Sequence, residues 1–220
     1  WGSRALVQPH IADMYRAGQI MDVDALVKNG LTDIRELTND DLTTKKGGVG
    51  EWNIRRRIQR DYTQSQEEWI SEEMADAVSN HQYPHHFIDF EATRIAVPYH
   101  AGMRPYQQVA FQWSCHTIWE KGGQLEHNEW INTKDYFPNF EFARTLKNQI
   151  GDDGTVFVWS PFERSALNGV LQEMIEKDHP DEELRTWLAA VATKDENASR
   201  LVDMYKICLK HYFHPAMEGK

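Results

Sequence analysis

The chain is poor in cysteine and in long apolar runs. Its two cysteines, Cys115 and Cys208, lie far apart and lack the C-x-x-C spacing of a zinc knuckle or a redox pair. We therefore expect two buried thiols and no disulfide framework. No apolar run approaches the roughly 20 residues that cross a bilayer, and none resembles the apolar region of a signal peptide. These absences predict a cytoplasmic protein that makes no membrane contact.

Basic residues are outnumbered by acidic ones. Lysine and arginine total 24 against 34 aspartates and glutamates, which gives a net charge of −10. Such a balance disfavours capture of a polyanion by the surface as a whole. It leaves room for a local site, because a bound metal ion inverts the charge where acids cluster. With 220 residues, 40% of them hydrophobic, the chain can form one core and a smaller helical unit.

One basic cluster stands out in the N-terminal third. Arg55, Arg56 and Arg57 are followed by Arg60, and Arg56 and Arg60 are i, i+4 neighbours on one face of an expected helix. Arg56 and Arg60 are therefore candidates for contacts to the phosphates of a substrate. The alternative is a solvated helix face, whose charge is offset by the acids Glu67, Glu68, Glu72 and Glu73.

Residues 1–80 are expected to form a helical region. Residues 9–18 and 23–30 are short amphipathic segments that each end at or near a glycine, the usual residue after a helix C-terminus. Residues 51–79 read as one long polar helix with a discontinuous apolar stripe. The whole region looks like a helix-hairpin module followed by a long helix. Whether it packs, or docks a partner or nucleic acid, is left open.

The pattern changes to strands after residue 80. Residues 87–91, 109–119 and 125–132 are predicted strands, and the continuous apolar run 155–159 is typical of a buried parallel strand. Helices are expected at 138–150, 160–176 and 180–193, and residues 200–213 read as mostly helical. This order predicts an α/β fold: a ribonuclease H-like mixed sheet, with antiparallel strands 1–3, a parallel strand 4 and flanking helices. The domain is assigned to residues 81–220, truncated at its C-terminus and part of a longer chain with other domains.

Two carboxylates lie at the end of the first of these strands. Side chains alternate along a strand, so Asp89 and Glu91 point to the same face with Cα atoms roughly 6.5 Å apart. Two like charges held together are unfavourable unless a proton or a cation lies between them. A divalent metal ion is the simplest such partner. The alternative is that both acids lie on the solvated face of a half-buried strand.

Two further acids are candidates for the same site. Glu163 lies at the expected start of the helix after the buried strand, where a ribonuclease H-like fold places it beside the first pair. A capping box formed by Ser160, Pro161 and Glu163 would also explain this glutamate. Asp203 is an acid inside an apolar run and is a candidate fourth ligand, although a solvated helix position explains it equally well.

Two segments carry a resemblance to a known family: FIDFEA at residues 87–92, followed by Pro98, and RPYQQVAFQWS at residues 104–114. They resemble an uncharacterised bacterial domain family of unknown function, which is itself similar to a divergent branch of the ribonuclease H-like DEDD exonucleases. The resemblance covers residues 83–220. It implies that Asp89 and Glu91 match the first exonuclease motif and that Glu163 falls near the second.

The chain departs from the exonuclease pattern in two places. The second motif usually has an asparagine upstream and an aspartate at the metal, whereas this chain has VWSPFE at residues 158–163. The last motif, a tyrosine or histidine followed by an aspartate, has no counterpart before Lys220. Either Asp203 substitutes for that last acid, or the acid lies beyond residue 220.

The resemblance implies a metal-dependent nuclease that cleaves phosphodiester bonds of DNA or RNA, exonuclease-like and acting on single-stranded ends. Asp89, Glu91 and Glu163 would hold two ions, and oxygen ligands favour Mg²⁺ or Mn²⁺. Asp203 would be the further catalytic acid. The alternative is an inactive ribonuclease H-like module that binds nucleic acid or a protein. Side chains beside the first strand are candidates for substrate binding by stacking or hydrogen bonds, namely Arg104, Tyr106, Gln107 and Gln108.

Overall fold

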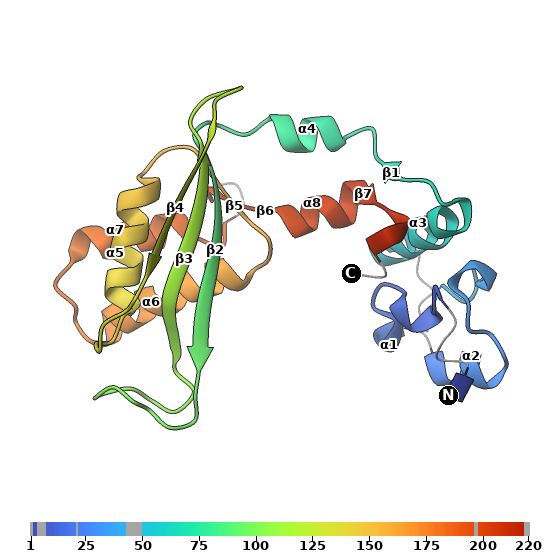
Figure 1. Ribbon diagram of the computed structural model, residues 1–220, viewed down its shortest axis with the longest axis horizontal. Coiled ribbons are helices and arrows are strands. Elements are labelled where there is room, and N and C mark those ends of the chain that lie inside the picture. The colour runs from blue at the N-terminus through green and yellow to red at the C-terminus, as the bar shows by residue number, and fades with distance from the viewer. Residues whose placement is uncertain (1, 4–7, 21, 43–49, 196–197, 218–220) are drawn as a thin grey trace. The chain divides into compact units, whose positions relative to one another are not determined.

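The computed structural model describes residues 2–3, 8–20, 22–42, 50–195 and 198–217 (Figure 1). It divides into two compact units: Trp1–Val78 together with Ile207–Lys220, and Ser79–Lys206. The first division therefore falls beside the boundary expected at residue 80. Residues 207–220 group with the N-terminal helices rather than with the sheet.

The second unit is built on a five-stranded mixed sheet in the order β4-β3-β2-β5-β6. β2 pairs antiparallel with β3, and β3 with β4, whereas β5 and β6 run parallel to β2. The strands are β2 (His85–Arg94), β3 (Gln108–Ile118), β4 (Leu125–Ile131), β5 (Thr155–Val158) and β6 (Leu201–Asp203). The α/β class and the antiparallel-then-parallel order expected from the sequence are both present.

Three helices cover one face of this sheet (Figure 1). They are α5 (Asn139–Ile150), α6 (Phe162–Glu176) and α7 (Glu182–Val191). The core lies between these helices and the sheet, where β2 contributes Ile88 and Phe90. Because side chains alternate along a strand, Asp89 and Glu91 project from the opposite face, which we call the open face.

One glycine is required by close packing in this unit. Gly154 precedes β5 with φ +79°, and a Cβ atom built there would collide with the backbone of Pro84. The amide of the next residue, Thr155, donates a hydrogen bond of 2.9 Å to the same Pro84 carbonyl. This contact aligns the start of β5 with the start of β2, and so sets where β5 ends relative to Asp89.

The first unit is helical with a two-stranded ribbon. It contains α1 (Ala17–Ile20), α2 (Val23–Lys28), α3 (Glu51–Ser65) and α4 (Met74–Ser79), with short 3₁₀ turns at Ile11–Asp13, Ile34–Glu36 and Pro215–Met217. β1 (Trp69–Ile70) pairs antiparallel with β7 (Tyr212–Phe213). A separate small core includes Ile11, Val27, Ile34 and Leu42.

One expectation about elements was wrong, and a second was right only in part. The long helix expected over 51–79 is divided into α3, β1 and α4, because Gln66 takes a left-handed conformation (φ 60°) that ends α3. The stretch 200–213, expected to be mostly helical, begins with the three-residue strand β6, continues as α8 (Met204–His211) and ends in β7. Within the described residues, no helix has the length and apolarity needed to cross a membrane.

Candidate functional site

The topology gathers three of the predicted acids at one edge of the sheet. β2, β5 and β6 are parallel neighbours, and the carboxyl ends of parallel strands meet at the same edge. Asp89 lies two residues beyond Phe87, the last residue of β2 that pairs with β5. Glu163 lies in the first turn of α6, which follows β5, and Asp203 is the last residue of β6.

Asp89 and Glu91 are solvent-exposed on the open face of β2. Their partners across β3 are Ser114 and Gln112, which carry no charge. A bulge follows directly, between Glu91 and Ala92. Bulges occur often beside active sites, where they re-aim a side chain. The structure therefore presents both carboxylates to solvent, and no cation of the described chain is hydrogen-bonded to either.

Glu163 differs from both because it is buried, with 3% of its surface exposed. Burial raises the pKa of its carboxyl, and the negative charge of Asp89 acts in the same direction. Ser160 Oγ lies 3.5 Å from Glu163 Oε2, at the limit of a hydrogen bond. A buried carboxyl that shares its surroundings with a second acid is typical of functional sites.

The start of α6 is capped differently from the expected capping box. The helix begins at Phe162 with Pro161 as its N-cap, rather than with Ser160. Ser160 Oγ accepts a hydrogen bond of 3.1 Å from the Phe162 amide, so the serine still satisfies one free N–H group. The carboxylate of Glu163 also accepts hydrogen bonds from the backbone amides of Ser160 and of Glu163 itself, so part of the reciprocal contact of a capping box is present, while burial still raises the pKa of Glu163.

Asp203 has a structural role at the same edge. Its Oδ1 accepts a hydrogen bond of 3.2 Å from the backbone amide of Lys206, in the first turn of α8. One carboxylate oxygen of Asp203 therefore caps α8, and the other oxygen, Oδ2, remains for a second ligand. This is the N-cap behaviour typical of aspartate.

The predicted metal ligands do not form a complete centre. Across the described residues, no three histidine, cysteine, aspartate or glutamate side chains come together as a metal-binding group. The fit to a divalent ion is therefore partial: Asp89 and Glu163 act on each other electrostatically, while Glu91 and Asp203 do not join them in one cluster.

Four of the six residues predicted to bind substrate lie together at a pocket. Arg104, Tyr106, Gln107 and Gln108 line a pocket of about 250 Å³ between the end of β2, the start of β3 and α6. Its wall on α6 includes Ser165 and Ala166, which follow Glu163 within one helical turn. The pocket therefore adjoins the helix turn that carries the buried acid, although the sequence did not suggest this connection.

Sequence reasoning missed three polar residues of the same pocket. Glu173 is 4% exposed, and its carboxylate accepts hydrogen bonds from Gln107 Nε2 at 2.6 Å and Asn139 Nδ2 at 2.9 Å. Arg94 donates to Gln108 Oε1 at 2.5 Å. Glu173 and Asn139 lie in ordinary helical sequence, so only the fold identifies them. Arg94 follows Glu91 by three residues, so its closeness in the sequence to the acidic pair could have identified it.

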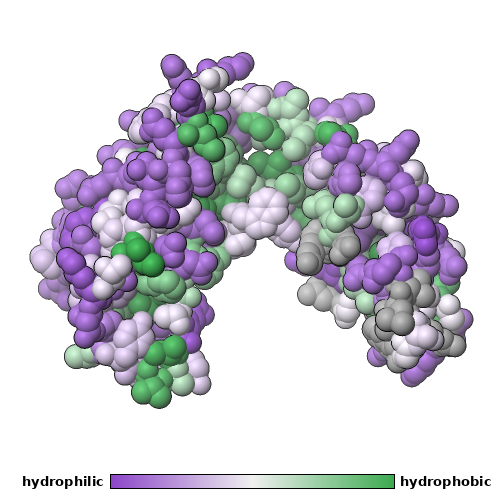
Figure 2. Space-filling model, viewed as in Figure 1, coloured by the Kyte–Doolittle hydropathy of each residue, from purple (hydrophilic) through white to green (hydrophobic). Residues whose placement is uncertain are grey.

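Tyr106 is strongly exposed at this pocket. Its side chain belongs to a residue that is 68% exposed, and its φ of 58° is unusual for a residue with a side chain. The Tyr106 amide donates a hydrogen bond of 2.8 Å to the carbonyl of Ile95, which holds this conformation. Val97 and Tyr99 are exposed on the same loop, and Figure 2 shows a hydrophobic patch at this end of the unit.

The prediction that Arg56 binds substrate was wrong. Arg56 is fully buried, and its guanidinium donates hydrogen bonds to the carbonyls of Tyr15 and Leu42. It fastens α3 to the N-terminal helices and is out of reach of a phosphate. Arg60 lies one turn further along α3, donates to the Leu37 carbonyl at 3.1 Å and contacts Asp61. Its guanidinium also serves packing within the first unit.

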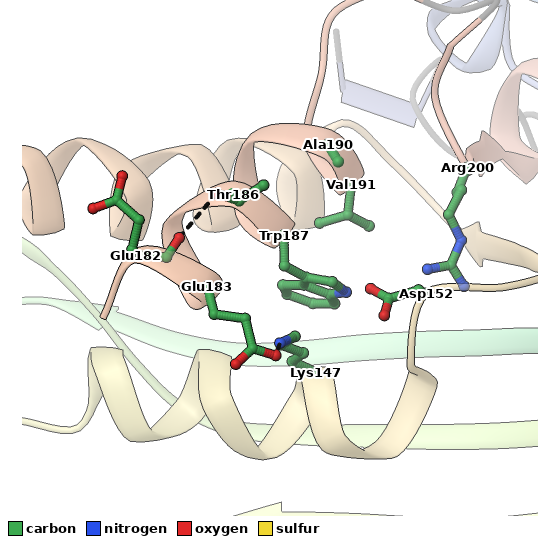
Figure 3. Close-up of a pocket in the computed structure, with 9 residues that line it drawn as sticks. All are labelled: Lys147, Asp152, Glu182, Glu183, Thr186, Trp187, Ala190, Val191 and Arg200. Carbon is green, nitrogen blue, oxygen red and sulfur yellow. Dashed lines mark hydrogen bonds and ion pairs between the residues drawn. The ribbon is translucent and has the colours of Figure 1, made fainter. Parts of the chain in front are cut away.

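A second pocket, of about 360 Å³, lies between α5, α7 and the turn before β5 (Figure 3). Its polar groups are engaged by the protein itself. Lys147 pairs with Glu183, and Trp187 Nε1 donates to the Gly151 carbonyl at 2.9 Å. The guanidinium of Arg200 donates to the carbonyls of Ile150, Gly151 and Gly154. These contacts indicate a packing role for this pocket.

Comparison with known proteins adds one finding. A family model described as a domain of unknown function, DUF2779, matches residues 86–220. No curated protein and no solved structure matches the chain. The matched segment is more than half of the chain and contains the sheet, the acids and the pocket of about 250 Å³. The chain therefore belongs to the DUF2779 family of domains of unknown function.

Proposed function

We propose that this chain is a divalent-metal-dependent nuclease with a ribonuclease H-like fold, exonuclease-like and acting on single-stranded ends of DNA or RNA. The observation that carries the proposal is that Asp89 on β2, Glu163 in the helix turn after β5 and Asp203 at the end of β6 all lie toward the carboxyl ends of three adjacent parallel strands. Ligands of open α/β sheets bind at this edge. The sheet order β4-β3-β2-β5-β6 supports the ribonuclease H-like assignment.

The described residues suit the first steps of such a reaction. Asp89 and Glu163 would hold Mg²⁺ or Mn²⁺, which supplies an activated water and neutralises charge on the phosphate. The raised pKa of Glu163 means that its carboxyl gains from a nearby cation, which would stabilise the ionised form. Glu91 and Asp203 complete the acidic edge without joining one cluster.

The pocket of about 250 Å³ would receive the end of the strand. Arg104 and Arg94 offer positive charge to phosphates, and the exposed ring of Tyr106 offers a stacking surface for a base. The amides of Gln107 and Gln108 are partly engaged with Glu173 and Arg94. They would therefore set the shape of the pocket more than they read a base.

A second candidate function is favoured by the incomplete ligand set. Because no three metal-ligating side chains converge in the described residues, the fold suits an inactive module that binds nucleic acid or a protein. Under this alternative Arg94, Arg104 and Tyr106 bind the nucleic acid or protein partner, and the acids support no metal-dependent cleavage.

The deciding experiment is Mn²⁺-dependent degradation of end-labelled single-stranded and duplex DNA and RNA by the full chain. Asp89→Asn is the test variant, and Glu129→Gln is the matched control because Glu129 is an exposed acid on the same open face. We expect cleavage that Asp89→Asn abolishes and Glu129→Gln retains. Cleavage that persists in Asp89→Asn would contradict the nuclease proposal. Binding without cleavage by the wild type would support the second candidate.

A further inference from the structure

The open face of the sheet carries two histidines on neighbouring strands. His116 on β3 and His127 on β4 are direct partners in the antiparallel register. Their rings stack, with centroids 4.4 Å apart and planes inclined by 27°. Directly opposed residues of an antiparallel pair have Cβ atoms about 5 Å apart, so the backbone itself holds these imidazoles together.

Both imidazoles are available to a ligand. His127 is exposed and His116 is half-buried. Within the described part of the chain, no protein group hydrogen-bonds to a ring nitrogen of His116 or His127. The contact that each ring makes there is the stacking contact with the other ring. The ring nitrogens of both histidines are therefore left to solvent or to a ligand.

The charge around the pair favours a cation. In the next row of the open face, Asp89 on β2 and Glu129 on β4 both lie opposite Ser114 of β3. Both acids are exposed. Both carboxylates therefore lie diagonally across from His116, and Glu129 is also two residues from His127 on β4, where these acids attract a bound positive ion.

We propose that His116 and His127 together bind a transition-metal ion of the Cu²⁺, Zn²⁺ or Ni²⁺ class. Metal–imidazole bonds are about 2.0–2.1 Å long, so two ligating nitrogens of one ion lie up to about 4 Å apart. The ring centroids lie 4.4 Å apart with planes inclined by 27°, so the two rings are close enough to share one ion once rotation about their side-chain bonds turns a nitrogen lone pair of each toward it. Imidazole is a preferred ligand of these ions and a poor one for Mg²⁺.

The site is a two-histidine site completed by water. Among the described residues no third metal-ligating side chain joins the pair, so solvent fills the remaining positions. Glu129 contributes charge from two residues along β4. The inference is independent of the proposed nuclease, whose carboxylates select a different class of metal ion.

A bound ion would join β3 to β4 at the outer side of the sheet. β4 pairs only with β3, so it is an edge strand, and its residues are mostly exposed. An ion that binds the folded chain and not the unfolded one stabilises it by mass action. Metal binding would therefore hold the edge strand against its neighbour.

The test is titration of the full, tag-free chain with Cu²⁺ and with Zn²⁺ in a calorimeter, together with electron paramagnetic resonance of the Cu²⁺ complex. The variants are His116→Asn, His127→Asn and the double variant. His179→Gln serves as the control. We expect one ion per chain, nitrogen hyperfine splitting from two imidazoles, and affinity at least about tenfold weaker in either single variant. His179→Gln should bind as the wild type does.

Two outcomes would overturn the inference. One is a Cu²⁺ signal in the double variant equal to that of the wild type, which would place the ion elsewhere. The other is an absence of stoichiometric binding by a wild-type chain whose circular dichroism is that of the folded protein. Loss of nuclease activity in the same preparations would not bear on it, because the readouts are binding and spectroscopy.

Discussion

Two glutamates on α6 are buried to the same extent and have opposite surroundings. Glu163, in the first turn, is 3% exposed, and Glu173, two to three turns later, is 4% exposed. Glu173 accepts hydrogen bonds from Gln107 and Asn139 and an ion pair from Lys177 at 2.6 Å. Glu163 has one side-chain neighbour, Ser160 Oγ, at 3.5 Å, and its pKa is raised.

The difference separates a structural acid from a functional one. A buried charge is tolerated when partners replace its water, and Glu173 has them. Glu163 keeps a desolvation cost that its hydrogen bonds with Ser160 and with its own backbone amide offset only in part, and the negative charge of Asp89 adds to that cost. A site that keeps such a cost in the folded protein is suited to a cation that arrives from outside.

The largest expected effect comes from neutralising Glu163. Glu163→Gln should reduce metal-dependent cleavage by about 10²- to 10³-fold, a loss typical of removing one electrostatic stabiliser from an active site. The free energy of unfolding should stay the same or rise, because a buried charge with a raised pKa is removed. Initial cleavage rates and urea denaturation measure the two effects. Loss of stability with retained activity would reverse the roles assigned to the two glutamates.

The next effect is on stability, at Glu173. Glu173→Leu should lower the free energy of unfolding by about 2 to 3 kcal/mol, because Gln107 and Asn139 lose their acceptor in a buried place. Glu176→Gln is the matched control on the same helix. Its carboxylate pairs with Arg104 at the surface, so its change should be below about 0.5 kcal/mol. Equal losses in urea denaturation for both variants would contradict the assignment.

The third effect tests another buried group that is short of partners. His86 is 1% exposed, its Nδ1 meets Thr117 Oγ1 at 3.0 Å, and its Nε2 is buried without a hydrogen bond. Burial, aided by the charge of Arg200, lowers the pKa of His86 to about 4. The unfolded chain therefore takes up a proton near pH 6.5 and the folded protein only near pH 4, so stability falls as pH falls between these values.

The size of this effect is at most about 3 kcal/mol, the free energy that corresponds to the lowered pKa. Urea denaturation of the wild type and of His86→Leu at pH 7 and at pH 4.5 measures it. The variant should lose less stability than the wild type on acidification. Parallel losses in the two proteins would show that other groups control the acid response.

The sequence predicted four of the five strands of the sheet unit because each of those four has a local signal. Alternation around Asp89 and the unbroken apolar run at 155–158 identify β2 and β5 without tertiary information. β6 has no such signal, since three residues at the start of a longer mixed apolar stretch are too few to show a period. It is a strand only because β5 lies beside it.

Sequence reasoning placed candidate residues that are close to one another along the chain, and it missed contacts between residues that are far apart in the sequence. Asp89 and Glu91 are two residues apart on one strand, so spacing alone placed them on one face. Glu173 and Asn139 lie on different helices and meet Gln107 only through packing. The prediction for Arg56 was wrong because a charged side chain in a polar helix is expected to be solvated. The carbonyl groups that bind Arg56 belong to segments about 14 and 41 residues away in the sequence.

Arg200 gives the short strand β6 a function out of proportion to its length. The guanidinium of Arg200 donates hydrogen bonds to carbonyls at the end of α5 and in the turn before β5. These bonds fix the position of the residue that directly precedes β6. A slip of one residue would turn Leu201 out of the core and exchange the two faces of the strand. The same slip would carry Asp203 away from the edge it shares with Glu163. Arg200 thus fixes the register of β6 from the start of the strand, and the register in turn sets the position of Asp203 at the other end, three residues later.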